Sequence, residues 1–216
     1  MSTVENLRKI CQILDANKIE YVIVGGIAAI LLGIQRTTLD IDIIINLTTE
    51  DEIKKLVEVL KAEGYNVSLY EALEAFKEKT HFTAIFEEGG IIDFKYVKSN
   101  LDILTLKRKI FMEILGIRIP ISPLEELITA KLKILGSQKD VEDALQLMYI
   151  YVDKINWKLL NSYIGENPLK YTNKIISTIM KEFPDEKQII NKIKNLEELK
   201  NKIENILSKT KTRSSQ

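Results

Sequence analysis

Two aspartates, Asp40 and Asp42, stand two residues apart in the segment LDIDIII, which covers residues 39–45. Side chains alternate between the two faces of a β-strand, so both carboxylates are expected on one face of a sheet. Two carboxylates on a buried face repel each other and lose hydration unless a cation compensates them. Because oxygen ligands suit Mg²⁺ or Mn²⁺, the pair is predicted to bind one of these ions.

A glycine pair, Gly25-Gly26, precedes the aspartates by 14–17 residues and follows the apolar run 21–24. Glycine lets the backbone approach a phosphate closely, and N–H groups at the start of the next helix can donate to it. The spacing leaves room for a short helix over 27–32 before the strand 39–45. A phosphate at the glycines is therefore expected to meet a metal ion at the aspartates, although a simple tight turn is the alternative.

The elements that position these residues change in kind along the chain. Amphipathic helices are predicted over 3–17 and 49–64, and strands over 21–24, 39–45, 81–87, 91–97 and 117–121. The turn Glu88-Gly89-Gly90 predicts a hairpin, 101–114 is ambiguous, and 117–121 is expected at a sheet edge. From Ser122 onwards only helical patterns follow. The order predicts an α+β fold, with an α+β domain over 1–121 and a helical domain over 122–216.

The glycine pair, a short helix and the segment Arg36-Thr37-Thr38-Leu39-Asp40-Ile41-Asp42 together resemble the nucleotidyltransferase (polymerase-β-like) superfamily. In detail the pattern is similar to a small prokaryotic branch that includes AbiEii-type toxins and lincosamide nucleotidyltransferases. The resemblance implies a small mixed β-sheet and a third metal-binding and catalytic carboxylate, for which Asp93 in the segment IIDF is the match. It also implies Mg²⁺-dependent transfer of a nucleoside monophosphate from an NTP to a hydroxyl of RNA, protein or a small molecule.

Basic residues complete the substrate-binding set that the resemblance implies. Lys131 matches a lysine that meets the triphosphate, and Lys139 matches a basic residue on the following helix. Asp140 and Asp143 either orient Lys131 or hold the helical domain in place. For Arg36, phosphate binding and pairing with a nearby acid both stay open. His81, the only histidine, is expected to be structural.

Composition narrows the setting of such an enzyme. The single cysteine, Cys11, excludes a disulfide within the chain and a cysteine-based zinc site, so a reducing, cytoplasmic location is expected. No apolar run approaches the roughly 18 residues of a membrane span. Positive and negative residues balance at 31 each, but residues 151–216 hold 13 basic and 8 acidic residues. This excess allows nucleic acid as a partner, and a solvated helical surface is the alternative.

Two other classes of function stay open at this stage. The chain could be an NTP-binding regulatory or antitoxin-type module without turnover, or a nucleic-acid-binding protein that uses its basic helical half. An apolar stripe over 185–208 either packs within its own domain or forms the seam of a homodimer. The last eight residues, 209–216, are rich in Lys, Thr and Ser and are predicted to be disordered.

Overall fold

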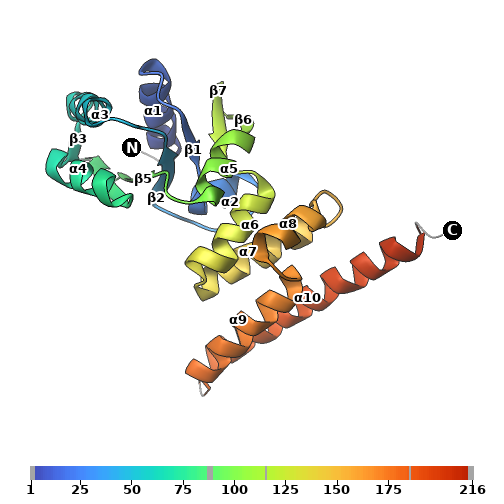
Figure 1. Ribbon diagram of the computed structural model, residues 1–216. Coiled ribbons are helices and arrows are strands. Elements are labelled where there is room, and N and C mark those ends of the chain that lie inside the picture. The colour runs from blue at the N-terminus through green and yellow to red at the C-terminus, as the bar shows by residue number, and fades with distance from the viewer. Residues whose placement is uncertain (1–2, 87–89, 115, 185, 214–216) are drawn as a thin grey trace. The chain divides into compact units, whose positions relative to one another are not determined.

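The computed structural model describes residues 3–86, 90–114, 116–184 and 186–213 (Figure 1). The chain divides into two compact units. Unit 1 comprises residues 1–31 and 35–123, and unit 2 comprises 32–34 and 124–216. Unit 1 mixes helices and strands and unit 2 is helical, which confirms the predicted α+β class with a helical C-terminal part.

Unit 1 is built on one mixed sheet, formed by seven strands within the described residues in the order β3-β4-β5-β2-β1-β7-β6. The strands are β1 (Tyr21–Ile23), β2 (Asp40–Ile45), β3 (Tyr65–Val67), β4 (His81–Phe86), β5 (Gly90–Tyr96), β6 (Ile110–Ile114) and β7 (Ile117–Ile121). The helices are α1 (Thr3–Ala16), α2 (Gly25–Leu31), α3 (Glu50–Ala62), α4 (Leu69–Glu78) and α5 (Asn100–Arg108).

The two faces of the central strands differ in chemistry because side chains alternate along them. On one face, Ile41 and Ile43 of β2 are fully buried, and the rings of Phe82 and Phe94 stack with centroids 5.1 Å apart. Helix α4 lies over this face, since the hydroxyl of Tyr96 donates to a carbonyl of α4 at 3.0 Å. The other face therefore carries the polar residues of the same strands.

Helix α5 covers one part of that second face. Leu106 of α5 packs with Val22 of β1 and Ile44 of β2 in a small buried cluster. Ile44 lies two residues after Asp42, so α5 covers the end of the face beyond the aspartates. The segment 101–114, ambiguous from sequence, is divided between α5 and β6, with Lys109 between them.

One prediction about the sheet is wrong. Strand β7, expected at an edge, lies between β6 and β1. Its antiparallel pairing with β6 can be predicted from the short connection between the two strands. Its parallel partner β1 is about 100 residues away in sequence, with Ile23 opposite Ile121. The strands 81–86 and 90–96 pair as the predicted antiparallel hairpin, whereas residues 87–89 of its turn lie outside the described residues.

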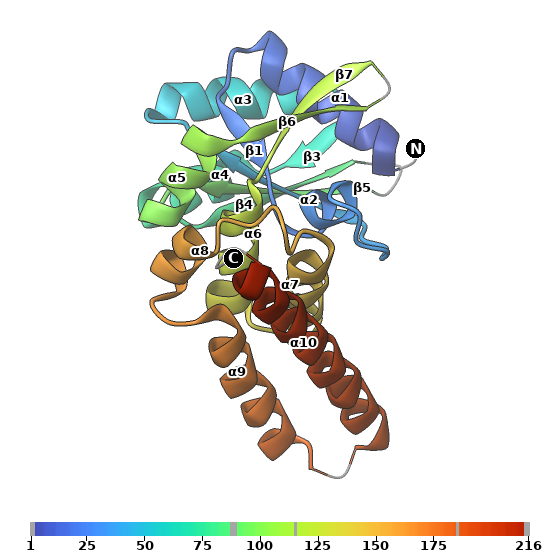
Figure 2. The ribbon, with the colours of Figure 1, turned by 90° about the vertical axis from the view of Figure 1, so that its right-hand side faces the viewer.

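Unit 2 consists of helices, and the short segment 32–34 clusters with them. They are α6 (Leu124–Ala130), the π-helix η1 (Lys131–Leu135), α7 (Gln138–Ile150), α8 (Trp157–Ile164), α9 (Pro168–Glu182) and α10 (Lys187–Arg213). Figure 2 shows α9 and α10 side by side. The hydroxyl of Tyr151 donates to the carbonyl of Leu32 at 3.1 Å, which ties the segment 32–34 to α7's C-terminal end.

Helix α10 uses its apolar stripe within unit 2. Ile193, Leu196 and Ile203 are buried, and α10 packs against α7 and α9. Of the two roles considered for this apolar stripe, the structure supports packing within its own unit. Helix α10 also continues to Arg213, so residues 209–213 of the predicted disordered tail are helical, while 214–216 lie outside the described residues. No helix in the described part of the chain is long and apolar enough to cross a membrane.

A buried ion-pair network holds η1 against α7. The Lys131 side chain is 1% exposed, and its Nζ lies 2.7 Å from Asp143 Oδ2 and 3.2 Å from Asp140 Oδ1. The carboxylate of Asp143 is itself only 4% exposed. The attraction between charges this far removed from water offsets the cost of burying them only while both signs are present. Lys131 is therefore a structural part of unit 2.

Replacing Asp143 with alanine should destabilise the protein strongly, because the ammonium of Lys131 would remain buried with one weaker partner. Breaking a buried ion pair typically costs about 3–5 kcal/mol. Glu142→Ala is the matched control, since its ion pair with Lys192 on α10 is exposed to solvent, and such pairs contribute only about 0–1 kcal/mol. Urea unfolding of the full chain measures both, and equal losses of stability would contradict the account.

Candidate active site

Two of the predicted carboxylates are neighbours across the sheet. Strands β2 and β5 run parallel, and Asp42 lies directly opposite Asp93 in their register. Adjacent strands are about 4.8 Å apart, and the two side chains stand on the same face. Both residues are half-buried, whereas Asp40, at the start of β2, is exposed and lies opposite Ile91. Asp42 and Asp93 therefore form the centre of the candidate site.

A threonine on the next strand extends this row of residues. Thr83 of β4 lies opposite Asp93 in the antiparallel register of β4 and β5. Its hydroxyl donates to Asp93 Oδ1 at 2.6 Å. The row Thr83, Asp93, Asp42 thus crosses three adjacent strands on one face.

The glycine pair lies on the other side of Asp42. Gly25 begins α2 with φ +62°, and a Cβ added there would overlap with the carboxylate of Asp42. A Cβ on Gly26 would lie 3.2 Å from Nη2 of Arg36 and 3.2 Å from Cγ2 of Thr38. The structure therefore brings Gly25 against Asp42, and Gly26 against Arg36 and Thr38.

The donor set fits a divalent cation bound together with a nucleotide. Within the described residues, no group of three or more His, Cys, Asp and Glu side chains is arranged to hold a metal ion. Mg²⁺ is commonly bound by one or two carboxylates, with substrate phosphates and water supplying the remaining oxygens. Asp42 and Asp93 offer two carboxylates, and Gly25, at the start of α2, lies against the carboxylate of Asp42.

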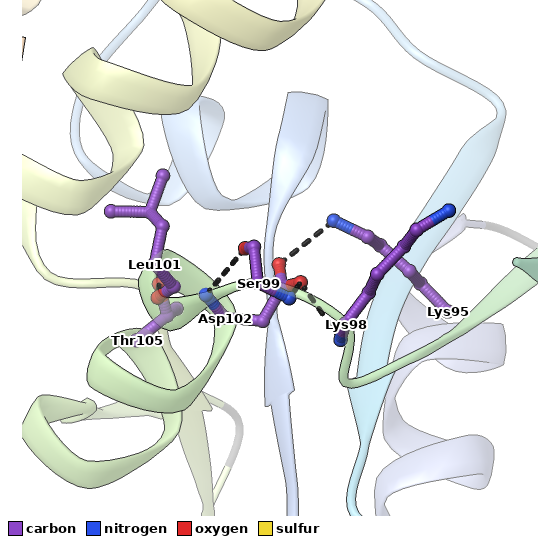
Figure 3. A network of polar contacts seen from close by, with 6 residues as sticks. All are labelled: Lys95, Lys98, Ser99, Leu101, Asp102 and Thr105. Atoms are coloured by element: carbon purple, nitrogen blue, oxygen red, sulfur yellow. Dashed lines mark hydrogen bonds and ion pairs between the residues drawn. The ribbon is translucent and has the colours of Figure 1, made fainter. Parts of the chain in front are cut away.

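A second polar network fixes the end of β5 (Figure 3). Lys95 lies two residues after Asp93 on the same face, and its Nζ donates to Asp102 Oδ1 at 2.8 Å. Asp102 also accepts from the backbone N–H groups of Ser99 and Lys98 at 2.8 and 3.1 Å, while the hydroxyl of Ser99 accepts from the Asp102 N–H. This capping box starts α5 and ties it to the strand that carries Asp93.

Burial of the Asp102 carboxyl acts to raise its pKa. The hydrogen bonds from Lys95 and Ser99 and the charge of Lys95 outweigh burial, so the pKa of Asp102 lies below its usual value. The carboxylate is therefore charged at neutral pH, which keeps the ion pair with Lys95 intact.

Neither Thr83 nor Asp102 is among the site residues predicted from sequence, although a sequence pattern is present for each of them. Thr83 and Asp93 are equally far from residue 88, so a hairpin symmetric about that residue pairs them. The segment Ser99-x-x-Asp102 has the form of a capping box. Lys131 and Lys139 belong to unit 2: Lys131 is held by its two carboxylates and Lys139 is exposed, so their binding of the triphosphate stays a prediction.

Residues 6–109 match the family model of aminoglycoside-2''-adenylyltransferase. The matched region is a little under half of the 216 residues and contains the glycine pair, Arg36 and all three aspartates of the candidate site. It ends before the helical unit. No curated protein sequence matches the chain significantly.

Several solved structures are similar to this chain at low sequence identity. The structure of ANT(2'')-Ia in complex with adenylyl-2''-tobramycin is similar with a TM-score of 0.52 and 15% identity, over 76% of this chain and 98% of that chain. An antigenic nucleotidyltransferase-like protein from Paracoccidioides brasiliensis gives a TM-score of 0.49 and 15% identity, over 89% and 92%. The lincomycin-bound lincosamide antibiotic adenylyltransferase LnuA gives 0.48 and 20%, over 66% and 94%.

The family match and the shared fold both point to one class of protein. They support nucleotidyl transfer, in which a nucleotidyl group passes from a nucleoside triphosphate to an acceptor, as the activity of this chain. Within that class, the matched region is similar to the aminoglycoside-2''-adenylyltransferase family.

Replacing Gly25 with alanine should destabilise the protein by more than the cost of its backbone conformation. A positive φ costs an alanine about 1–2 kcal/mol, and the new Cβ would also displace the Asp42 carboxylate. Gly136→Ala is the control, because Gly136 has the same φ of +62° and only the carbonyl oxygen of Leu132, at 3.9 Å, near its Cβ position. Urea unfolding should show a larger loss for Gly25→Ala, and an equal or larger loss for Gly136→Ala would contradict the geometry.

The contribution of Asp102 to stability should depend on pH. Since its pKa is lower in the folded protein than the value of about 3.9 in unfolded chains, its stabilisation is complete above that value. It is lost as pH falls through the lower folded pKa. The stability difference between wild type and Asp102→Asn should therefore be large at pH 7 and shrink below about pH 4.

Asp51→Asn is the matched control for this measurement, because Asp51 also lies in the first turn of a helix but its side chain is 92% exposed. Urea unfolding at a series of pH values should show a small effect for Asp51→Asn at every pH. A wild-type–Asp102→Asn difference that is the same at pH 3 and pH 7 would refute the role assigned to the carboxylate.

Proposed function

We propose that this chain is a Mg²⁺-dependent nucleotidyltransferase that transfers a nucleoside monophosphate from an NTP to a hydroxyl group. The observation that carries the proposal is the in-register pair Asp42 and Asp93, with the Gly25-Gly26 turn against the Asp42 carboxylate. Two neighbouring carboxylates next to a phosphate-binding turn are suited to a triphosphate bound with its cation, and poorly suited to either ligand alone.

Asp40, Asp42 and Asp93 are the residues proposed to hold the cation. Mg²⁺ or Mn²⁺ would supply charge neutralisation for the triphosphate and for the pyrophosphate that leaves. Asp42 and Asp93 are placed to share it, because they are directly paired. Asp40 is more exposed and stands one side-chain repeat further along the same face, where it can reach the outer part of the site.

The chain's own groups account for binding and alignment of the substrates. The N–H groups of Gly25 and Gly26 and the guanidinium of Arg36 bind the phosphates, since all three lie on the α2 side of Asp42. In an in-line displacement the attacking and leaving oxygens are on opposite sides of the α-phosphorus. The acceptor hydroxyl then approaches from the Asp93 side, and Asp93 accepts its proton as the bond to phosphorus forms and pyrophosphate leaves.

Lys131 and Lys139 are proposed to strengthen binding of the triphosphate as the resemblance implies, in addition to the structural role of Lys131. The exposed Lys139 is the simpler cation to test, because its replacement does not disturb the buried ion-pair network of Lys131.

The family match favours a small molecule as the acceptor and adenylate as the transferred group. Its model is that of an aminoglycoside-2''-adenylyltransferase, and the similar ANT(2'')-Ia structure holds adenylyl-2''-tobramycin. We therefore propose an amino-sugar hydroxyl as the first acceptor to test, which corresponds to a role in antibiotic resistance. The resemblance to the AbiEii-like branch supports a toxin–antitoxin role as the second candidate, with RNA or a protein as the acceptor.

The test is transfer of label from each of the four α-³²P-labelled NTPs in the presence of Mg²⁺. An aminoglycoside, a lincosamide, total RNA and cell protein are offered in turn as acceptors. Label on an aminoglycoside or a lincosamide, with ATP preferred, would support the resistance-type activity, and label on RNA or protein would support the toxin-type activity. Metal-dependent NTP binding without transfer to any of these acceptors would instead favour a regulatory module.

Replacing Asp42 with alanine should lower the transfer rate by at least about a hundredfold, because a metal-binding carboxylate stabilises the transition state by several kcal/mol. Glu113→Ala is the control, since it removes an exposed acid from β6 of the same sheet. The rate of label transfer measures the effect, and circular dichroism checks the fold of both variants. An Asp42→Ala enzyme with a near-normal rate would overturn the assignment.

A further inference from the structure

Among the residues described, Thr83 is the side chain that forms a hydrogen bond with Asp93. It donates to Asp93 Oδ1 at 2.6 Å, which is the short distance of a hydrogen bond to a charged oxygen. Threonine is β-branched, so its side chain has few orientations on a strand. Thr83 is thus a rigid donor that holds one of the two oxygens of the Asp93 carboxylate.

The strand order places Thr83 on the acceptor side of the proposed site. Strand β5, with Asp93, lies between β4 and β2, and β2 lies between β5 and β1. Helix α2 and its glycines follow β1, so the phosphate-binding turn is on the far side of Asp42 from Asp93 and Thr83. Thr83 also borders a surface hollow of about 280 Å³, together with Tyr70 of α4 and His81 of β4, on the side of the sheet that α4 covers.

We propose that Thr83 is a positioning residue of the transfer reaction. By holding Oδ1 of Asp93, it leaves the other carboxylate oxygen directed to the cation shared with Asp42 and to the acceptor hydroxyl. The proposal rests on the proposed function, because it assigns Asp93 the role of cation ligand and proton acceptor. Residues that hydrogen-bond to a metal ligand typically affect metal affinity or activity by about 10–100-fold.

A purely structural role for Thr83 makes a different prediction. In that case the threonine only fills its position in β4, and valine, which has the same branched shape, would replace it without loss of activity. Serine would be the poorer replacement, because it loses the methyl group and has a lower preference for strands. The two explanations therefore rank the valine and serine variants in opposite order.

The test compares Thr83→Val and Thr83→Ser with wild type. At saturating Mg²⁺, we expect Thr83→Val to lower kcat about tenfold or more and to leave the KM for NTP within about twofold, because the triphosphate is bound on the other side of Asp42. Thr83→Ser keeps the hydroxyl and should stay within about threefold of the wild-type kcat. Thr80→Val is the control, since Thr80 lines the same hollow.

A second readout does not require turnover. Isothermal titration of Mn²⁺ into the protein with a non-hydrolysable ATP analogue should give several-fold weaker binding for Thr83→Val and an unchanged value for Thr83→Ser. Asp93→Asn serves as the positive control, because it removes the carboxylate itself. Thermal unfolding of each variant shows whether the fold is kept. A general loss of the fold would lower kcat and Mn²⁺ affinity in Thr83→Ser as well as in Thr83→Val.

The outcomes separate the two proposals. Wild-type kcat and Mn²⁺ affinity in Thr83→Val, or equal losses in the valine and serine variants, would overturn the role of Thr83 while leaving the proposed function standing. Two results together would support the role of Thr83 and contradict the proposed function. These are weaker Mn²⁺ binding in Thr83→Val but not in Thr83→Ser, and no transfer of label to any acceptor by the wild-type protein. A wild type that binds no Mn²⁺ with the analogue would overturn both.

Discussion

Unit 1 is organised around the electrostatic cost of placing Asp42 and Asp93 opposite each other on adjacent strands. Two like charges at strand spacing repel, and partial burial strengthens the repulsion because less water screens it. The surroundings of the pair supply positive or hydrogen-bonding groups from each side, with the Gly25-Gly26 turn beside Asp42 and the Thr83 hydroxyl on Asp93. The ligand that we propose for this pair is a divalent cation bound together with a triphosphate.

The rest of unit 1 keeps that face of the sheet available. Helix α4 packs on the opposite face, where Tyr96 and the stacked pair Phe82 and Phe94 form the aromatic part of the core. Helix α5 covers only the end of the face beyond the aspartates, and its capping residue Asp102 is held by Lys95 of the same strand as Asp93. Paired strands and one anchored helix therefore set the positions of Asp42 and Asp93.

Patterns that depend on near neighbours in sequence could be predicted, and those that depend on distant partners could not. The strand at Asp40 and Asp42, the short helix at the glycine pair and the hairpin that carries Asp93 are local patterns, and the structure contains all three elements. The interior position of β7 arises from its parallel pairing with β1, for which no local pattern exists. Similarly, the sequence shows Lys131 only as a lysine on a predicted helix. Its burial depends on α7, which packs against it and brings Asp143 to its ammonium group.

We propose that Asp42 and Asp93 share a divalent cation with the phosphates of a bound nucleotide. A crystal structure of the protein with Mn²⁺ and a non-hydrolysable ATP analogue, in which anomalous scattering locates the metal, would test this directly. We expect a manganese peak within about 2–2.5 Å of an oxygen of each carboxylate, with the phosphates at Gly25-Gly26. A nucleotide bound away from these glycines, or a metal that contacts neither aspartate, would contradict the proposal.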